Sequence, residues 1–152
     1  MVPKDFDWRK YSKEHNFTEE RYQELRSICA TYRHLKLEYE DAITLSAYSL
    51  GGVIKTKGNR AVYNDTMSRG IRAAEISDKL ELLEKIFRIS DARMAPYMKE
   101  YLTDANYMHR GPEEFLDEKS YAIDRRYFTR CWRYTICCLD EELRKRENHS
   151  TK

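Results

Sequence analysis

The feature that most constrains this chain is the helical spacing of its apolar residues. Between Thr18 and Ala47, and again between Asp65 and Arg88, apolar side chains recur at every third or fourth position. That period places them on one face of an α-helix. Only 5 Gly and 3 Pro are present to interrupt such helices, and so few turn residues argue against an all-β fold. The sequence therefore predicts an all-α protein built on two long helices.

The apolar faces of the two long segments are narrow, as in helices that pack against each other. We expect a helical hairpin or a dimerisation arm over residues 18–89. Tyrosines recur along the seam, and they suit a partly solvent-exposed interface because a phenol has an apolar ring and a polar hydroxyl. The residues of this predicted dimer or partner seam are Tyr22, Leu25, Tyr32, Leu35, Tyr39, Leu80, Leu83 and Phe87.

The segment between the two long helices has three glycines and no helical period, which predicts a flexible loop over residues 49–63. Lys55, Lys57 and Arg60 make it basic, and contact with phosphate groups is one interpretation. The spacing of a phosphate-binding loop, GxxxxGK followed by Ser or Thr, is missing. Linker duty is the preferred interpretation.

Three helices are expected in the last third of the chain, residues 90–146. The first covers about Ala92–Tyr107, the second is short and begins at Pro112 after Gly111, and the third follows Asp124. A proline just inside a helix start, after a glycine past the previous end, is a common arrangement. Two short-linked helices at the end of such a unit are typical of a helix-turn-helix. Residues 1–17 form an N-terminal strap or a short helix, and residues 147–152 are expected to be a frayed tail.

The third of these helices is expected to be apolar on one face and rich in arginine on the other. Asp124 can cap its N-terminus, because its carboxylate can accept from free backbone N–H groups of the first turn. An arginine-rich N-terminal half suits a helix that enters a DNA major groove, and a solvated surface helix is the alternative. The predicted DNA-binding residues are Arg125, Arg126, Thr129, Arg130 and Arg133.

Composition limits the classes of fold and of function that the chain can have. Charged residues make up 36% of the chain and the mean hydropathy is −0.86, which favours long, partly exposed helices over one large core. The net charge is only +2, so binding to a polyanion must come from a local basic patch. The sequence contains no run of about 18 apolar residues, so no membrane-spanning helix is predicted. The four cysteines have no metal-ligand spacing and suit reduced thiols in a cytosolic protein. No catalytic constellation, metal site or cofactor site is predicted.

The segment from Ile123 to Ile136 resembles the recognition-helix segment of the RinA/ArpU-type phage transcriptional regulators. Its sequence is Ile-Asp-Arg-Arg-Tyr-Phe-Thr-Arg-Cys-Trp-Arg-Tyr-Thr-Ile. The segment from Asn64 to Ile86 is similar to that family's helix between the linker and the DNA-binding end. The order of elements and the length also agree, so the resemblance is one of pattern over about residues 18–146.

The resemblance implies a phage or prophage DNA-binding regulator with a helix-turn-helix like region four of sigma factors. It implies double-stranded DNA as the partner, with RNA polymerase or another host protein as a further one, a homodimer, and the cytoplasm of a bacterial host. The alternative from a different class is a phage-encoded helical interaction module, an inhibitor or adaptor of a host protein, because aromatic residues dominate interface energetics.

The approach to the arginine helix departs from the family pattern. The family usually has an apolar-small pair and then a glycine in the turn, whereas residues 117–120 here are charged or polar and include no glycine. Phe115 and Leu116 supply the apolar pair if the turn is about two residues longer. Four acidic residues nearby also weaken attraction to a phosphate backbone. The expectations are a remodelled turn that keeps DNA binding, or a divergent member in which binding is reduced.

Overall fold

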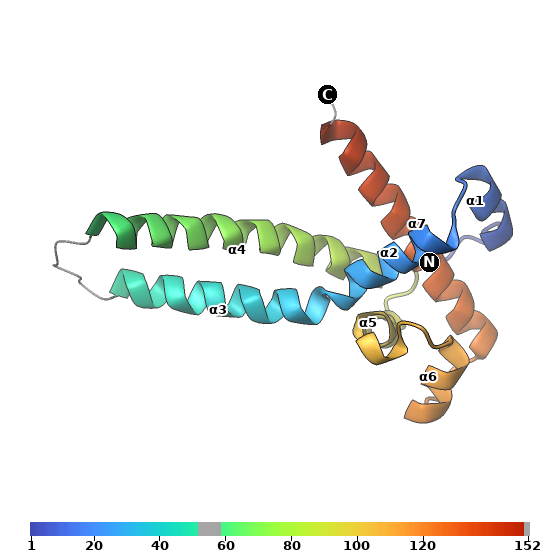
Figure 1. Ribbon diagram of the computed structural model, residues 1–152. Helices are drawn as coiled ribbons and strands as arrows, with labels where there is room; N and C mark the ends of the chain where they lie inside the picture. The colour runs from blue at the N-terminus through green and yellow to red at the C-terminus, as the bar shows by residue number, and fades with distance from the viewer. Residues whose placement is uncertain (52–58, 151–152) are drawn as a thin grey trace. The chain divides into compact units, whose positions relative to one another are not determined.

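Every regular element of the protein that the structure describes is a helix, as the sequence predicts. The computed structural model describes residues 1–51 and 59–150, with side chains over 1–44 and 70–148. None of the described helices is long and apolar enough to cross a membrane. In chain order (Figure 1) the elements are α1 (Trp8–Glu14), α2 (Glu19–Ala30), α3 (Tyr32–Gly51), α4 (Asn59–Arg88), α5 (Ala95–Thr103), the 3₁₀ turn η1 (Ala105–Tyr107), α6 (Pro112–Lys119) and α7 (Arg125–Ser150).

The chain divides into two compact units. One contains residues 1–31 and 83–152, and the other contains residues 32–82. These boundaries differ from the predicted regions 18–89 and 90–146, because the helix predicted from Thr18 to Ala47 is interrupted. The Thr31 hydroxyl donates to the Ile28 carbonyl at 2.6 Å, and the Thr31 N–H is shared between the carbonyls of Ser27 and Ile28, each at 3.2 Å. The bond to Ser27 is the regular helical one, whereas the two bonds to Ile28 reach only three residues back and compete with it. α2 ends at Ala30, just before this residue.

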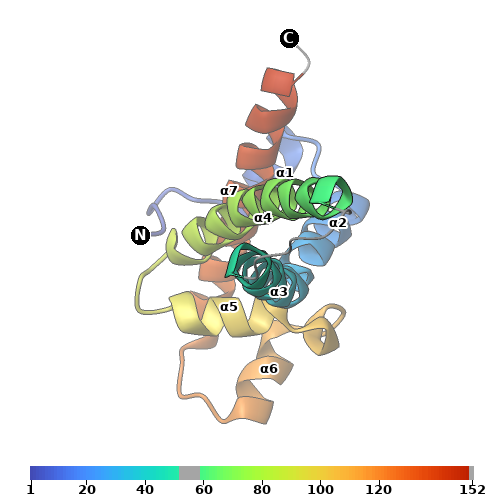
Figure 2. The same ribbon diagram turned by 90° about the vertical axis from the view of Figure 1, so that its left-hand side faces the viewer.

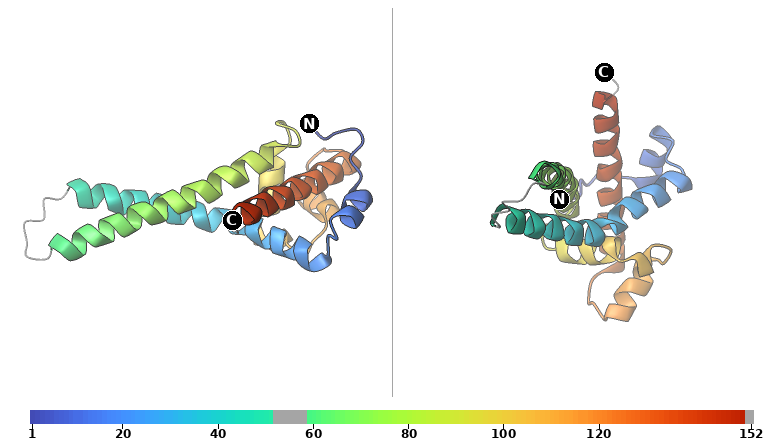
Figure 3. Two further views of the ribbon diagram at one scale, coloured as in Figure 1. Left: turned by 90° about the horizontal axis from the view of Figure 1, so that it is seen from above. Right: turned by 60° about the vertical axis from the view of Figure 1, so that its left-hand side comes forward.

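The unit of residues 32–82 is a helical hairpin, in which α3 and the first part of α4 run side by side (Figures 1 and 3). Leu35, Ala42 and Ile76 are buried in it. Arg72 on α4 pairs with Glu38 on α3, with 2.8 Å between Nη2 and Oε1. Both ends of the segment predicted as a loop, residues 49–63, are helical, since α3 continues to Gly51 and α4 starts at Asn59; residues 52–58 lie outside the described residues.

The other unit is arranged around α7, which α1, α2 and α6 contact. Figure 2 shows α5 and α6 near the first half of α7. Four rings on α5, η1, α6 and α7 fill the core beside this half. Their centroids lie 5.1–5.8 Å apart for the pairs Tyr101–Phe115, Tyr107–Phe115, Phe115–Phe128 and Tyr101–Phe128. The tail predicted to fray from residue 147 is helical through Ser150.

A buried carboxylate fixes α1 and α2 to the second half of α7. Asp140 is fully buried and accepts from the Tyr11 hydroxyl and from Arg21 Nε, each at 2.7 Å. Arg144, one turn later, donates to it at 3.1 Å. Burial acts to raise the pKa of Asp140, but the hydrogen bonds from these three groups outweigh it and lower the pKa below its ordinary value. Asp140 is therefore charged in the folded protein at neutral pH.

Candidate nucleic-acid interface

The turn between α6 and α7 has five residues, 120–124, and is built without glycine. Ser120 ends α6 in the left-handed conformation, with φ 56° and ψ 35°, a region that favours glycine. The Tyr121 N–H then donates to the Leu116 carbonyl at 3.1 Å. At the other end, the Asp124 side chain accepts from the Tyr127 N–H at 2.8 Å, which confirms the predicted cap of α7. A serine thus occupies the left-handed position that ends α6.

Phe115 and Leu116 provide the apolar pair of α6, and both are buried. The acidic residues around them are largely paired within the unit. Arg110 contacts Glu114 at 2.7 Å and also pairs with Glu118. The hydrogen bond from Arg110 is the main cause that lowers the pKa of Glu118. The negative charge that the sequence places near a phosphate backbone is therefore partly neutralised.

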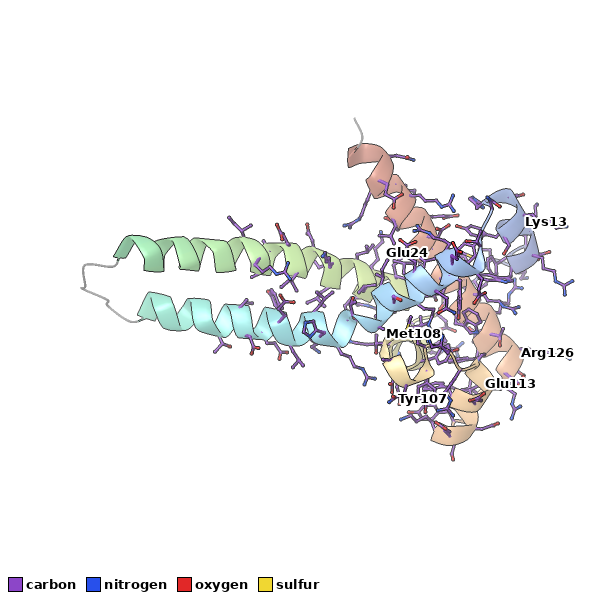
Figure 4. All side chains as sticks on the ribbon, in the orientation of Figure 1. Lys13, Glu24, Tyr107, Met108, Glu113 and Arg126 are labelled. Atoms are coloured by element: carbon purple, nitrogen blue, oxygen red, sulfur yellow. The ribbon has the colours of Figure 1, made fainter. Side chains whose placement is uncertain are left out.

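The first turn of α7 exposes two of the five predicted DNA-binding residues. Arg125 pairs with Asp117 at 2.7 Å and lies 3.8 Å from Glu113. Arg126 is exposed and has no ion pair or side-chain hydrogen bond with any described residue. Figure 4 labels Arg126 and Glu113 close to the start of α7. Thr129, one turn further, is half-buried.

Arg130 and Arg133 face the N-terminal segment. Arg130 donates to the backbone carbonyls of Pro3, Lys4 and Phe6 at 2.5, 3.1 and 3.2 Å. The Arg133 guanidinium carbon lies 5.6 Å from the ring centroid of Trp8. The predicted face is therefore divided between an exposed first turn and a second turn that residues 3–8 cover.

A groove of about 720 Å³ lies between this N-terminal segment and α7. Six basic and three acidic residues line it, so its formal charge is positive. Lys4 and Arg9 belong to it, and the sequence reasoning missed both. The signal was the set of basic and aromatic residues in the first ten positions. The lining residues are Lys4, Asp5, Phe6, Asp7, Trp8, Arg9, Glu113, Arg125, Arg126, Thr129, Arg130 and Arg133.

The other predicted site residues lie elsewhere. Lys55 and Lys57 are outside the described residues, and Arg60 lies in α4 with a side chain that is also outside them. The predicted seam is mostly an internal packing surface: Leu25, Tyr32, Leu35, Leu83 and Phe87 are buried, and Tyr22, Tyr39 and Leu80 are half-buried. Tyr32, Leu35, Tyr39 and Leu80 belong to the hairpin unit, whereas Tyr22, Leu25, Leu83 and Phe87 belong to the other unit.

The described side chains include no group of three or more His, Cys, Asp or Glu residues that could hold a metal ion. Neither a protein-family model nor a curated protein nor a solved structure matches this chain.

Proposed function

We propose that the protein is a DNA-binding transcriptional regulator, of phage or prophage type, that contacts duplex DNA with the start of α7. The observation that carries the proposal is the exposed, unpaired Arg126 at the head of a helix that follows a short helix and a five-residue turn. In helix-turn-helix proteins the N-terminal residues of the second helix contact base edges. Residues 125–133 extend over about 12 Å at 1.5 Å per residue, which is comparable to the width of a major groove.

The division of the arginine face supports distinct roles within this proposal. Arg126 is available to a guanine edge or a phosphate, and Arg125 can exchange its exposed pair with Asp117 for one with DNA. An exposed ion pair contributes little to stability, about 0–1 kcal/mol, so this exchange is inexpensive. Lys4 and Arg9 are exposed at the edge of the groove and would contact the adjacent phosphate backbone.

Fluorescence anisotropy with random duplex DNA tests the proposal. We expect affinity to fall steeply with salt, with a slope of log K against log salt of about −0.9 for each phosphate contacted. The pair of substitutions Arg125→Ala and Arg126→Ala should weaken binding at least tenfold and leave the helical circular dichroism unchanged. Arg88→Ala is the matched control, since Arg88 is an exposed arginine on α4 outside the groove. Undiminished binding by the Arg125 and Arg126 double variant would refute the assignment to α7.

A helical interaction module that acts on a host protein such as RNA polymerase is the second candidate. Leu37, Ile43 and Ile71 of the hairpin are 61, 44 and 59% exposed, and exposed apolar side chains favour a protein partner, a second copy of the chain included. Salt-independent, negligible binding to random duplex DNA would favour this candidate over the first. Selection of bound sequences from a random DNA pool separates the two directly, because only the regulator should enrich a defined site.

A further inference from the structure

We propose that the groove between the N-terminal segment and α7 binds a small ligand that carries two or more linked phosphates, and that Arg133 is its central contact. This site goes beyond the proposed regulator function and does not depend on it.

Arg133 lies close to two aromatic rings and has no hydrogen-bonding partner among the residues that the structure describes. Its guanidinium carbon lies 5.6 Å from the ring centroid of Trp8 and 5.7 Å from that of Trp132. Both rings attract the positive charge of the guanidinium at these distances. Arg133 Nε is buried without an acceptor, and no ion pair of Arg133 exists with any side chain that the structure describes. A buried donor without a partner is uncommon and needs an explanation; the one that we propose is an acceptor supplied by a ligand.

The groove around Arg133 has more cations than its own acids neutralise. Lys4, Arg9 and Arg126 have no carboxylate partner among the described residues. Two of the three acidic lining residues are already used. Asp7 caps α1 by accepting from the backbone N–H groups of residues 9 and 10, and Glu113 lies 3.8 Å from Arg125. A ligand with several negative charges would supply the missing balance.

Size and chemistry favour a phosphate chain over a single carboxylate. A volume of about 720 Å³ lies within the usual range for small-molecule sites, about 300–1,000 Å³. The planar arginine fork matches phosphate oxygens in pairs. Phe6 and Trp8 also line the groove, and aromatic side chains can stack on a base, so the phosphates can come from a free polyphosphate or from a nucleotide.

Both tryptophans of the chain contact Arg133, which provides a direct assay. Trp8 and Trp132 are the 2 tryptophans of the sequence, so their emission should respond when a ligand polarises this guanidinium. We expect a saturable change when the full chain is titrated with tripolyphosphate at constant ionic strength. Sodium sulfate at the same ionic strength should give no saturation. An identical response to sulfate, or no saturable response to either tripolyphosphate or ATP, would overturn the proposal.

Substitutions locate the site. Affinity is measured here by calorimetry, because a substitution at residue 133 also alters the tryptophan emission. It should fall at least tenfold in Arg133→Gln and also in Arg133→Lys, since lysine lacks the planar fork of arginine. Arg126→Gln should weaken binding several-fold at an exposed position that the fold does not need. Arg88→Gln, outside the groove, should bind like the wild type. Wild-type affinity in both Arg133→Gln and Arg126→Gln contradicts the site.

The two sources of phosphate are separated by comparing ATP with tripolyphosphate. Tighter binding of ATP assigns a nucleotide, and equal binding assigns the phosphate chain; both outcomes support the groove. The DNA proposal is tested apart, by Arg125→Ala and Arg126→Ala in anisotropy, so either proposal can fail while the other stands.

Discussion

Removal of the buried carboxylate Asp140 should destabilise the protein by about 3 kcal/mol. Breaking a buried ion pair by deleting one partner costs about 3–5 kcal/mol. The lower end applies because Arg21 and Arg144 retain some access to water, with side chains 16 and 39% exposed, and because the Tyr11 hydroxyl keeps a second acceptor, the Cys137 carbonyl at 3.2 Å. For a chain of this size, about 3 kcal/mol corresponds to a fall in Tm of about 6–12 °C.

Urea unfolding of Asp140→Ala, followed by circular dichroism and tryptophan emission, measures this loss. Asp117→Ala is the matched control. Asp117 also pairs with an arginine at 2.7 Å, but its side chain is 63% exposed, so its loss should cost no more than about 1 kcal/mol. Equal destabilisation by the two variants would refute the argument from burial.

The cost of Asp140→Ala should also depend on pH in a defined direction. The folded-state pKa of Asp140 is lowered from 3.8, so its contribution is present above that value and is lost as the pH falls through the folded pKa. The difference in unfolding free energy between the wild type and Asp140→Ala should therefore shrink as the pH is lowered from 6 towards 3. A difference that stays constant would mean that the charge of Asp140 contributes nothing.

Three further outcomes are expected. Gly70→Ala should raise the free energy of unfolding of the hairpin by about 0.5–1 kcal/mol, because an added Cβ meets no atom within 4 Å; an unchanged or lower melting temperature contradicts this. Ser120→Gly should stabilise the α6–α7 turn by about 0.5 kcal/mol by relieving a left-handed serine at φ 56°, and urea unfolding would show a loss instead if the turn needs the serine. The thiols should react slowly with an aromatic disulfide reagent in the native protein and all four at once in denaturant, since burial raises the pKa of each of Cys29, Cys131, Cys137 and Cys138.

Helical periodicity was sufficient to predict the fold class and most helices, but not the break at Thr31. Leu25, Cys29, Tyr32 and Leu35 keep the spacing of three and four across the break, so the pattern reads as one helix. At the interruption the hydroxyl and the N–H of a single threonine both bond to the Ile28 carbonyl, and this residue type occurs in intact helices as well. The short helix at Pro112 was predictable because proline and the preceding glycine mark its start.

The candidate site could be predicted from the sequence only in part, for a different reason. Periodicity correctly places Arg126, Arg130 and Arg133 away from the apolar face of α7, but it cannot tell which segment covers that polar face. Residues 3–8 lie more than a hundred positions from α7 in the sequence, and their carbonyls satisfy Arg130. Phe6 and Trp8 among charged residues were the available indication that this segment packs on the protein.

The groove and the Asp140 network are physically linked through α1. Trp8 begins α1 and borders Arg133, while Tyr11, one turn later on the same helix, is bound to Asp140. Trp8, which forms part of the groove wall, is thus held in position by the bond between Tyr11 and Asp140 in the second half of α7. A residue that never touches the ligand can therefore alter its affinity by loosening α1. A loss of affinity in a variant should therefore be compared with the unfolding free energy of the same variant before it is assigned to a lost ligand contact. The part of the loss that comes from destabilisation should be smallest at Arg126, which is exposed and has no partner among the described residues.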